Sequence, residues 1–126
     1  MKNYGRVLIV DDSSTSRMII QRCMEMAGIG VTEYLFAENG LDAFATLRAN
    51  SGIELVITDI NMPKMDGRTF ATLLRGDSSM ASIAVVIVSS IADSVLEMEL
   101  RSIGVKSVVK KPVSPAKMLQ AIGEGS

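Results

Sequence analysis

The chain has 126 residues, 48% of them hydrophobic, and a formal net charge of −1 from 13 basic and 14 acidic side chains. That length suits one domain with a sizeable core, and the apolar content excludes a disordered chain. The balanced charge, an aromatic content of 4% and the lack of Trp argue against a nucleic-acid-binding module, which needs a basic surface and stacking side chains. We expect a single, monomeric domain over residues 1–126, with no output domain.

Cysteine and histidine usage narrows the location and the chemistry. The first apolar run, residues 7–10, is too short for a signal peptide, and no stretch is long enough to span a membrane. The single cysteine, Cys23, excludes an internal disulfide and fits a reducing compartment, so a soluble cytoplasmic protein without membrane insertion is predicted. The absence of histidine excludes Ser-His-Asp and Cys-His nucleophile pairs and a His-ligated zinc site.

Five short apolar runs, rich in β-branched residues, alternate with amphipathic stretches. The predicted strands cover residues 7–10, 31–37, 53–58, 83–88 and 105–109. The first, third and fourth runs are almost continuously apolar, as expected of strands that are covered on both faces of a parallel sheet.

Helical signals fill the segments between the strands. The run SSTS after the first strand and the pair Ser114-Pro115 after the last are typical helix starts. Helical spacing predicts that Cys23, Leu73 and Leu119 face the core. The resulting order, βαβαβαβαβα, predicts an α/β fold with a parallel sheet and right-handed crossovers.

Polar side chains converge on one edge of this predicted sheet. In open parallel α/β sheets, ligands bind beyond the carboxyl ends of the strands. Those ends carry three carboxylates, one hydroxyl and one ammonium group: Asp11, Asp12, Asp59, Ser89 and Lys111. Each one alone is common at a strand end or helix cap, but the five together indicate a reaction centre.

Three carboxylates at one edge repel one another unless a cation lies among them. Without histidine or a usable thiol the ligands are oxygens, which suit Mg²⁺, Mn²⁺ or Ca²⁺, and a shallow site with few acids favours Mg²⁺. A metal ion and the Lys111 ammonium facing one carboxylate form a clamp for a phosphoryl group. An aspartate can itself be the nucleophile that accepts this group, and Ser89 can donate a hydrogen bond to it.

Four segments resemble response-regulator receiver domains, most closely the single-domain chemotaxis (CheY-like) type. They are VLIVDDSSTSRMII, LVITDINMPKMDG, VVIVSS and VVKKP, and the resemblance covers nearly the whole chain. It implies a flavodoxin-like (βα)5 doubly wound sandwich with a five-stranded parallel sheet in the order 2-1-3-4-5. It also implies a phosphorylation-controlled role in two-component or phosphorelay signalling of the chemotaxis type.

The resemblance assigns roles to the acidic residues. Asp59 accepts a phosphoryl group from a sensor histidine kinase or a histidine phosphotransfer protein. Asp12, Asp59 and the backbone carbonyl of Asn61 hold Mg²⁺, or Mn²⁺ in its place. Asp11 assists through a metal-bound water.

The resemblance also assigns the switch residues. Ser89 turns toward the phosphoryl group, Lys111 pairs with it, and the peptide bond between Lys111 and Pro112 is cis. The lysine next to the proline, rather than its neighbour Lys110, takes this role.

One position departs from the family pattern. Val108 stands where the family usually has an aromatic ring on the fifth strand, so signalling must depend on Ser89, the loop after it and nearby helix positions. The implied output is contact with a protein target through the face of the fourth helix, fifth strand and fifth helix, where Met98 and Met118 are candidate contact residues.

Three alternative functions stay open. The domain can act as a phosphate sink or relay shuttle without a dedicated target. A haloacid-dehalogenase-type phosphatase also uses an aspartate nucleophile, but its second acid would fall at Asn61. A flavin-binding module shares the fold, but its phosphate would meet three carboxylates. The resemblance implies a protein that catalyses only its own phosphorylation and dephosphorylation.

Overall fold

The computed structural model describes residues 3–91 and 93–123 and confirms the predicted alternation of strands and helices. In chain order the elements are β1 (Asn3–Val10), α1 (Ser14–Met26), β2 (Gly30–Ala37), α2 (Gly40–Ala49), β3 (Ile53–Asp59), α3 (Gly67–Arg75), a 3₁₀ turn (Ser78–Met80), β4 (Ala84–Ser89), α4 (Ser94–Ser102), β5 (Ser107–Lys110) and α5 (Pro115–Ile122). In this described part, no helix has both the length and the apolar character of a membrane span.

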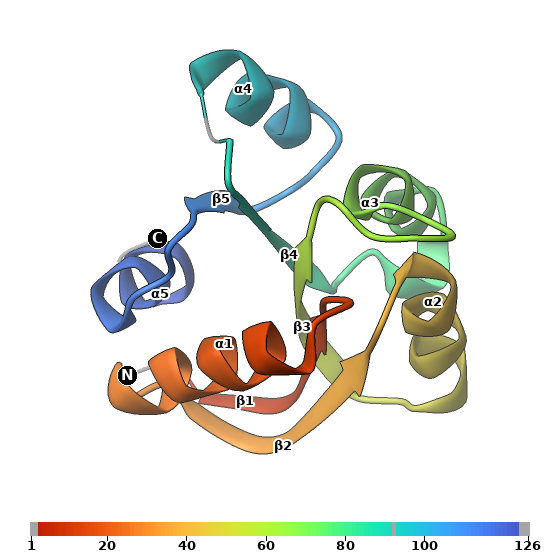
Figure 1. Ribbon diagram of the computed structural model, residues 1–126. Helices are drawn as coiled ribbons and strands as arrows, with labels where there is room; N and C mark the ends of the chain where they lie inside the picture. The colour runs from red at the N-terminus through yellow and green to blue at the C-terminus, as the bar shows by residue number, and fades with distance from the viewer. Residues whose placement is uncertain (1–2, 92, 124–126) are drawn as a thin grey trace.

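The sheet has five parallel strands in the order β2-β1-β3-β4-β5, which confirms the flavodoxin-like α/β fold. α1 and α5 lie together on one side of the sheet, and α2 and α3 lie on the other (Figure 1). The strand order leaves β1 and β3 side by side in the centre, so that their carboxyl ends open at the same edge.

Residues of β1 alternate between two hydrophobic clusters, one on each face of the sheet. Leu8 and Val10 pack in the cluster that includes buried residues of α2, α3 and α4. Val7 and Ile9 pack in the cluster that includes buried residues of α1 and α5. All four are fully buried, which explains why this strand reads as a continuous apolar run.

Each of the five helices starts with a side chain that accepts a hydrogen bond from the backbone N–H three residues later. These N-cap residues are Ser13, Asn39, Asp66, Asp93 and Ser114. Such caps satisfy N–H groups that the first helical turn leaves without partners. The two helix starts predicted from SSTS and Ser114-Pro115 are therefore confirmed.

The predicted inward residues are only partly confirmed. Cys23 is buried, but Leu73 and Leu119 are 46% and 42% exposed, so both predictions of an inward side chain were wrong. The buried positions next to them are Leu74 on α3 and Met118 on α5. Adjacent helical residues point about 100° apart, so short helices with narrow buried stripes bury one leucine and expose its neighbour.

Candidate functional site

The register of the sheet brings the predicted residues to one edge. Val10 of β1 pairs with Thr58 of β3, so Asp11 and Asp59 follow from adjacent strands at the same level. Ser89 of β4 pairs with Lys110 of β5, so Lys111 leaves its strand one residue beyond Ser89. Positions far apart in the chain therefore meet where four strands end.

The three acids form a compact cluster. One oxygen from each of Asp11, Asp12 and Asp59 lies within 4.8 Å of the others. Asp11 and Asp59 are buried, at 1% and 6% exposure, whereas Asp12 is exposed. The cluster thus lies at the surface with two of its carboxylates withdrawn from water.

Lys111 supplies positive charge to the same place. Its Nζ lies 3.4 Å from Asp59 Oδ1 and 3.9 Å from Asp11 Oδ2. Asp59 Oδ1 also accepts a hydrogen bond of 2.9 Å from the backbone N–H of Ile60. One ammonium group therefore faces two buried carboxylates, and the peptide bond from Lys111 to Pro112 is cis, as the resemblance implies.

Among the three acids, Asp11 is the one whose carboxyl pKa is clearly raised by its surroundings. Burial raises the pKa of its carboxyl, and the charges of Asp59 and Asp12 raise it further, against the lowering effects of the Ser13 N–H and Lys111. Its Oδ2 is buried without a hydrogen-bond partner, because Lys111 at 3.9 Å is too far for one. The ammonium group alone does not satisfy this cluster.

The residues fit a divalent cation. A buried carboxylate oxygen without a hydrogen bond, beside two further carboxylates, is the donor set that hard oxygen-binding cations require. The exposed Asp12 leaves one side of the cluster open to water and to ligands. Within the described residues, this is the one group of acids close enough together to hold a metal.

The loop after Asp59 is fixed at both ends. The Gly67 N–H donates to Ile60 O at 2.9 Å, which joins the end of the loop to its start. The Gly40 N–H donates to Met65 O at 3.0 Å, which ties the loop to the start of α2. Asn61, whose backbone carbonyl is a predicted metal ligand, is exposed in this loop. Its proposed coordination stays a prediction.

Ser89 lies at the edge but is turned to its own loop. Its hydroxyl donates to Ile91 O at 2.6 Å and accepts from the Ile91 N–H at 3.1 Å. Ser89 is 2% exposed, so these two bonds satisfy an otherwise buried hydroxyl. In this arrangement Ser89 is close to the acids along the sheet edge but is not bonded to them.

Sequence reasoning missed Arg17. Its Nη1 donates to the backbone carbonyl of Asp11 at 2.6 Å, from one turn into α1. The sequence shows only an arginine six residues after an acid, and a long side chain at that spacing has many possible partners. Only the position of α1 over the end of β1 selects this one.

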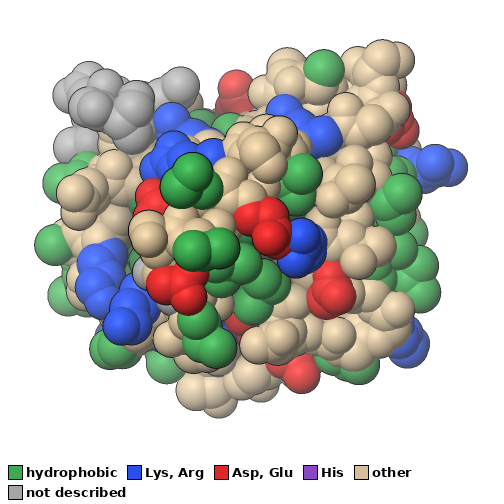
Figure 2. Space-filling model, turned by 90° about the horizontal axis from the view of Figure 1, so that it is seen from above, with side chains coloured by type: hydrophobic (Ala, Val, Ile, Leu, Met, Phe, Trp, Pro, Cys, Tyr) green, Lys and Arg blue, Asp and Glu red, His purple; other side chains and the backbone are tan. Residues whose placement is uncertain are grey.

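The two methionines predicted as contacts on the output face differ in exposure, and a contact at Met98 stays a prediction. Met98 on α4 is 72% exposed, but Met118 on α5 is fully buried, so its prediction as a contact residue was wrong. Figure 2, seen from the α4 end of Figure 1, shows acidic, basic and hydrophobic side chains interspersed without one kind dominating. Val108 is half-buried and packs against the cluster under α4.

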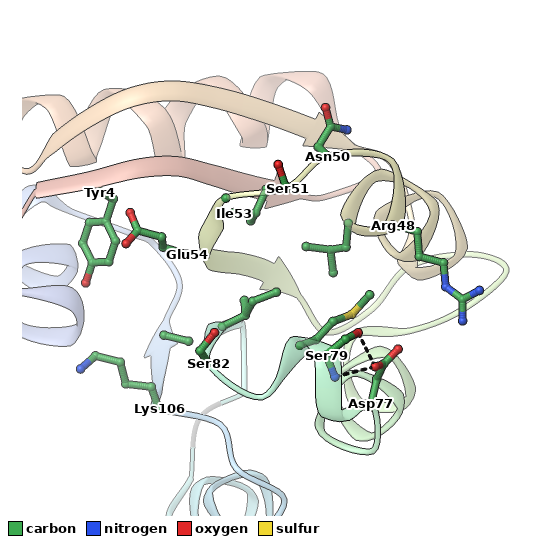
Figure 3. A pocket seen from close by; sticks show the side chains of 15 residues that line it. Tyr4, Arg48, Asn50, Ser51, Ile53, Glu54, Asp77, Ser79, Ser82 and Lys106 are labelled. Atoms are coloured by element: carbon green, nitrogen blue, oxygen red, sulfur yellow. Dashed lines mark hydrogen bonds between the residues drawn. The ribbon is translucent and has the colours of Figure 1, made fainter.

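A large cavity lies elsewhere. It measures about 770 Å³ and is lined by residues at the amino ends of the strands and in nearby loops, among them Tyr4, Glu54, Ser82 and Lys106 (Figure 3). Its charged groups have both signs, and within the described residues it contains no cluster of acids suited to a metal. The sheet edge with the acids is therefore the better candidate for the functional site.

Comparison with known proteins finds a matching family model and several similar chains. The model of the response regulator receiver domain family matches residues 7–123. The chemotaxis protein CheY1 of Helicobacter pylori is 33% identical over 110 residues, with 87% of each chain covered. The chemotaxis protein CheY homolog of Campylobacter jejuni is 30% identical over 125 residues, which cover 96% of this chain and 95% of that one.

Two further similarities concern a larger protein and a solved complex. A segment of the sensor histidine kinase CheAY of H. pylori is 36% identical over 109 residues, which are 86% of this chain but 13% of that protein. A chain in the crystal structure of a CheX-CheY-BeF3-Mg²⁺ complex from Borrelia burgdorferi superposes with a TM-score of 0.81. It is 28% identical, and the match covers 94% of this chain and 86% of that one.

Proposed function

The chain belongs to the response-regulator receiver family, as a CheY-type receiver in two-component signalling, and on that premise we propose that Asp59 is its phosphoacceptor. The observation that carries the proposal is the placement of this buried carboxylate 3.4 Å from Lys111 and within the acidic cluster. The donor is the phosphohistidine of a sensor histidine kinase or a histidine phosphotransfer protein.

The two oxygens of Asp59 have different surroundings. Oδ1 is held by the Ile60 N–H and faces Lys111, whereas Oδ2 has no hydrogen bond within the described part of the chain. We assign the attack on phosphorus to Oδ2. A new P–O bond forms as the P–N bond of the donor breaks, and the imidazole nitrogen keeps the electron pair and takes up a proton.

Asp11, Asp12 and Asp59, with the backbone carbonyl of Asn61, are the proposed holders of Mg²⁺ or Mn²⁺. The metal, when bound, offsets the negative charge of the phosphoryl oxygens. Lys111 stabilises the same charge from the β5 side. The unsatisfied Asp11 Oδ2 supports this assignment, because a cation bound there would offset its burial beside two other acids.

The proposed output is a change at Ser89 and α4. A phosphoryl group on Asp59 offers Ser89 a charged acceptor in place of Ile91 O, and the loop that leads into α4 must then rearrange. Val95 and Met98, each 72% exposed, lie on α4 where a protein target in a chemotaxis-type pathway can bind. With Val108 on β5, this switch operates without an aromatic ring at that position.

Among the alternatives, a phosphate sink or shuttle would use the same chemistry at this site as a switch that binds a target. The two roles differ in whether a target binds the phosphorylated form. A phosphatase is disfavoured because Asn61, two residues after Asp59, is not an acid. We propose that the domain turns over no external substrate and that it acts in the cytoplasm as a monomer.

The deciding experiment is incubation with acetyl phosphate and Mg²⁺, followed by intact-mass measurement. The wild type should gain one phosphoryl group and Asp59→Asn none. Asp66→Asn is the matched control, because Asp66 caps α3 in the same loop and Asn is an equally good cap. Labelling of Asp59→Asn at the wild-type level would falsify the assignment, as would an unlabelled wild type.

A further inference from the structure

Asp11 has four hydrogen-bonding groups, and three of them are occupied. Its N–H donates to Ala37 O at 3.1 Å, and its Oδ1 accepts from the Ser13 N–H at 2.9 Å. Its backbone carbonyl accepts from Arg17 Nη1 at 2.6 Å. Only Oδ2 is left without a hydrogen bond, and this oxygen faces Lys111 and the other acids. The bonds to the other three groups therefore determine where Oδ2 points.

Arg17 is the only one of the three partners of Asp11 that bonds through its side chain; Ala37 and Ser13 bond through their backbones. Arg17 is half-buried, and no carboxylate of the described residues lies within ion-pair distance of its guanidinium group. An arginine that is partly withdrawn from water and pairs with a carbonyl rather than an acid has lost hydration without gaining a salt bridge. Its contact with Asp11 is therefore the interaction that accounts for its position.

Arg17 bridges the whole turn between β1 and α1. Its backbone N–H donates to Ser13 O at 3.0 Å, while its side chain reaches back to Asp11 O. Ser13 in turn caps α1 and donates to Asp11 Oδ1. The arginine thus fixes the first turn of α1 and the first carbonyl after β1 relative to each other.

We propose that Arg17 is a positioning residue for the cation site: by holding the Asp11 carbonyl it keeps Asp11 Oδ2 aimed at the acidic cluster. This inference rests on the proposed function, because it concerns the Mg²⁺ that the cluster would bind. Groups that orient metal ligands from outside the coordination shell change metal affinity by about 10- to 100-fold when they are removed.

The direction in which the Mg²⁺ affinity changes when Arg17 is replaced distinguishes a positioning role from a purely electrostatic one. The positive charge of Arg17 is close to the site and on its own opposes a cation, so removing charge alone would tighten Mg²⁺ binding. Loss of positioning would weaken it. Arg22 lies on the exposed side of the same helix, so Arg22→Met removes the same charge without touching Asp11 and is the matched control.

The test measures Mg²⁺ affinity by calorimetric titration and, without metal, the exchange rate of the Ser13 amide. Arg17→Met should weaken Mg²⁺ binding about tenfold and speed Ser13 exchange, and Arg17→Lys should recover part of both. Arg22→Met should bind Mg²⁺ at least as tightly as the wild type. An Arg17→Met protein with unchanged or tighter Mg²⁺ binding overturns the proposal.

Two further outcomes are decisive. If Arg17→Met does not fold, Arg17→Lys replaces it, because Lys keeps the charge but not the guanidinium fork, and wild-type affinity in that variant overturns the proposal. If the wild type binds no Mg²⁺, the proposed function fails. The exchange rate of the Ser13 amide then still tests whether Arg17 fixes the turn around Asp11. An unchanged rate in Arg17→Met shows that it does not.

Discussion

Arg68, in the first turn of α3, forms an ion pair with Glu99 in the middle of α4. The pair connects the helix that follows the Asp59 loop with the helix that follows the Ser89 loop. α4 contributes only one fully buried residue, Leu100, to the core. A polar contact at its outer side therefore matters more for α4 than it would for a deeply packed helix.

Loss of this ion pair should loosen α4. Both side chains are more than a third exposed, so Arg68→Ala should cost no more than about 1 kcal/mol, and amide exchange in α4 should speed up several-fold. Glu97→Ala is the control, since Glu97 pairs with Arg101 within α4 and does not reach α3. The charge swap Arg68→Glu with Glu99→Arg should restore slow exchange. Unchanged α4 exchange in Arg68→Ala contradicts a restraining role.

Gly67 should tolerate no side chain. A Cβ at this position would lie 2.2 Å from Asp59 O and 3.0 Å from Ile60 Cα, both backbone atoms that cannot move aside. Gly67→Ala should therefore destabilise the protein by about 1–3 kcal/mol in urea unfolding and slow phosphorylation of Asp59, because the strand end must shift. Gly76→Ala, at the other end of α3, meets nothing closer than 3.5 Å and should be nearly neutral. Equal stability of the two variants would refute the steric argument.

Tyr34 should make the protein sensitive to alkaline pH. Burial, with a smaller effect of Glu25, raises the pKa of Tyr34 to about 12, and its hydroxyl is buried without a hydrogen bond. The unfolded chain loses this proton near pH 10 while the folded protein keeps it, so stability falls as the pH rises from 10 towards 12. The loss over that interval should be on the order of 2 kcal/mol.

Tyr34→Phe should remove this alkaline loss and raise stability at pH 7 by up to about 1 kcal/mol, since no hydrogen bond is given up. Urea unfolding at pH 7 and pH 11 measures both effects. Tyr4→Phe is the contrast, because the Tyr4 hydroxyl donates to Ile122 O at 3.3 Å and its loss should destabilise. A Tyr34→Phe protein with the wild-type pH dependence shows that another group is responsible.

Ser89→Ala should uncouple the loop from the phosphoryl group. Without the hydroxyl, the Ile91 amide loses its acceptor, and its exchange should speed up by an amount equivalent to about 1 kcal/mol. Phosphorylation of Asp59 should then leave the Ile91 amide resonance unshifted, although intact mass still shows labelling. Ser90→Ala, at the exposed neighbouring position, should behave as the wild type. A wild-type shift of Ile91 in Ser89→Ala would place the switch elsewhere.

Residues that depend on strand order alone were predictable from the sequence. Asp11, Asp59 and Lys111 come together because parallel strands end at one edge, and apolar runs mark those ends. The partner of Ser89 was not predictable, since a hydroxyl in a loop bonds to whichever backbone group the local path brings near. The contact of Arg17 with Asp11 was not predictable for a similar reason, because a long side chain has several possible partners within its reach.

The errors on the helices have one cause. Leu73 and Leu119 were each assigned to the buried face by a helical period that fixes the side-chain direction only to within about one residue, and Met118 was named as a contact from its helix alone. On helices of eight or nine residues, that uncertainty equals the difference between the core and the solvent. This error is rarer for the strands of a parallel sheet, because a strand that is buried on both faces requires no prediction of which side chains face the core.

The site at the strand ends also has a consequence for synthesis of the chain. Its acids lie near the start and the middle of the sequence, and Lys111 lies near the end on β5. A chain with β5 undocked holds its carboxylates without their ammonium partner, because Lys111 follows β5. If Asp59 is the phosphoacceptor proposed above, the site is complete only after β5 has docked, so the chain becomes able to receive a phosphoryl group only when its last strand is in place.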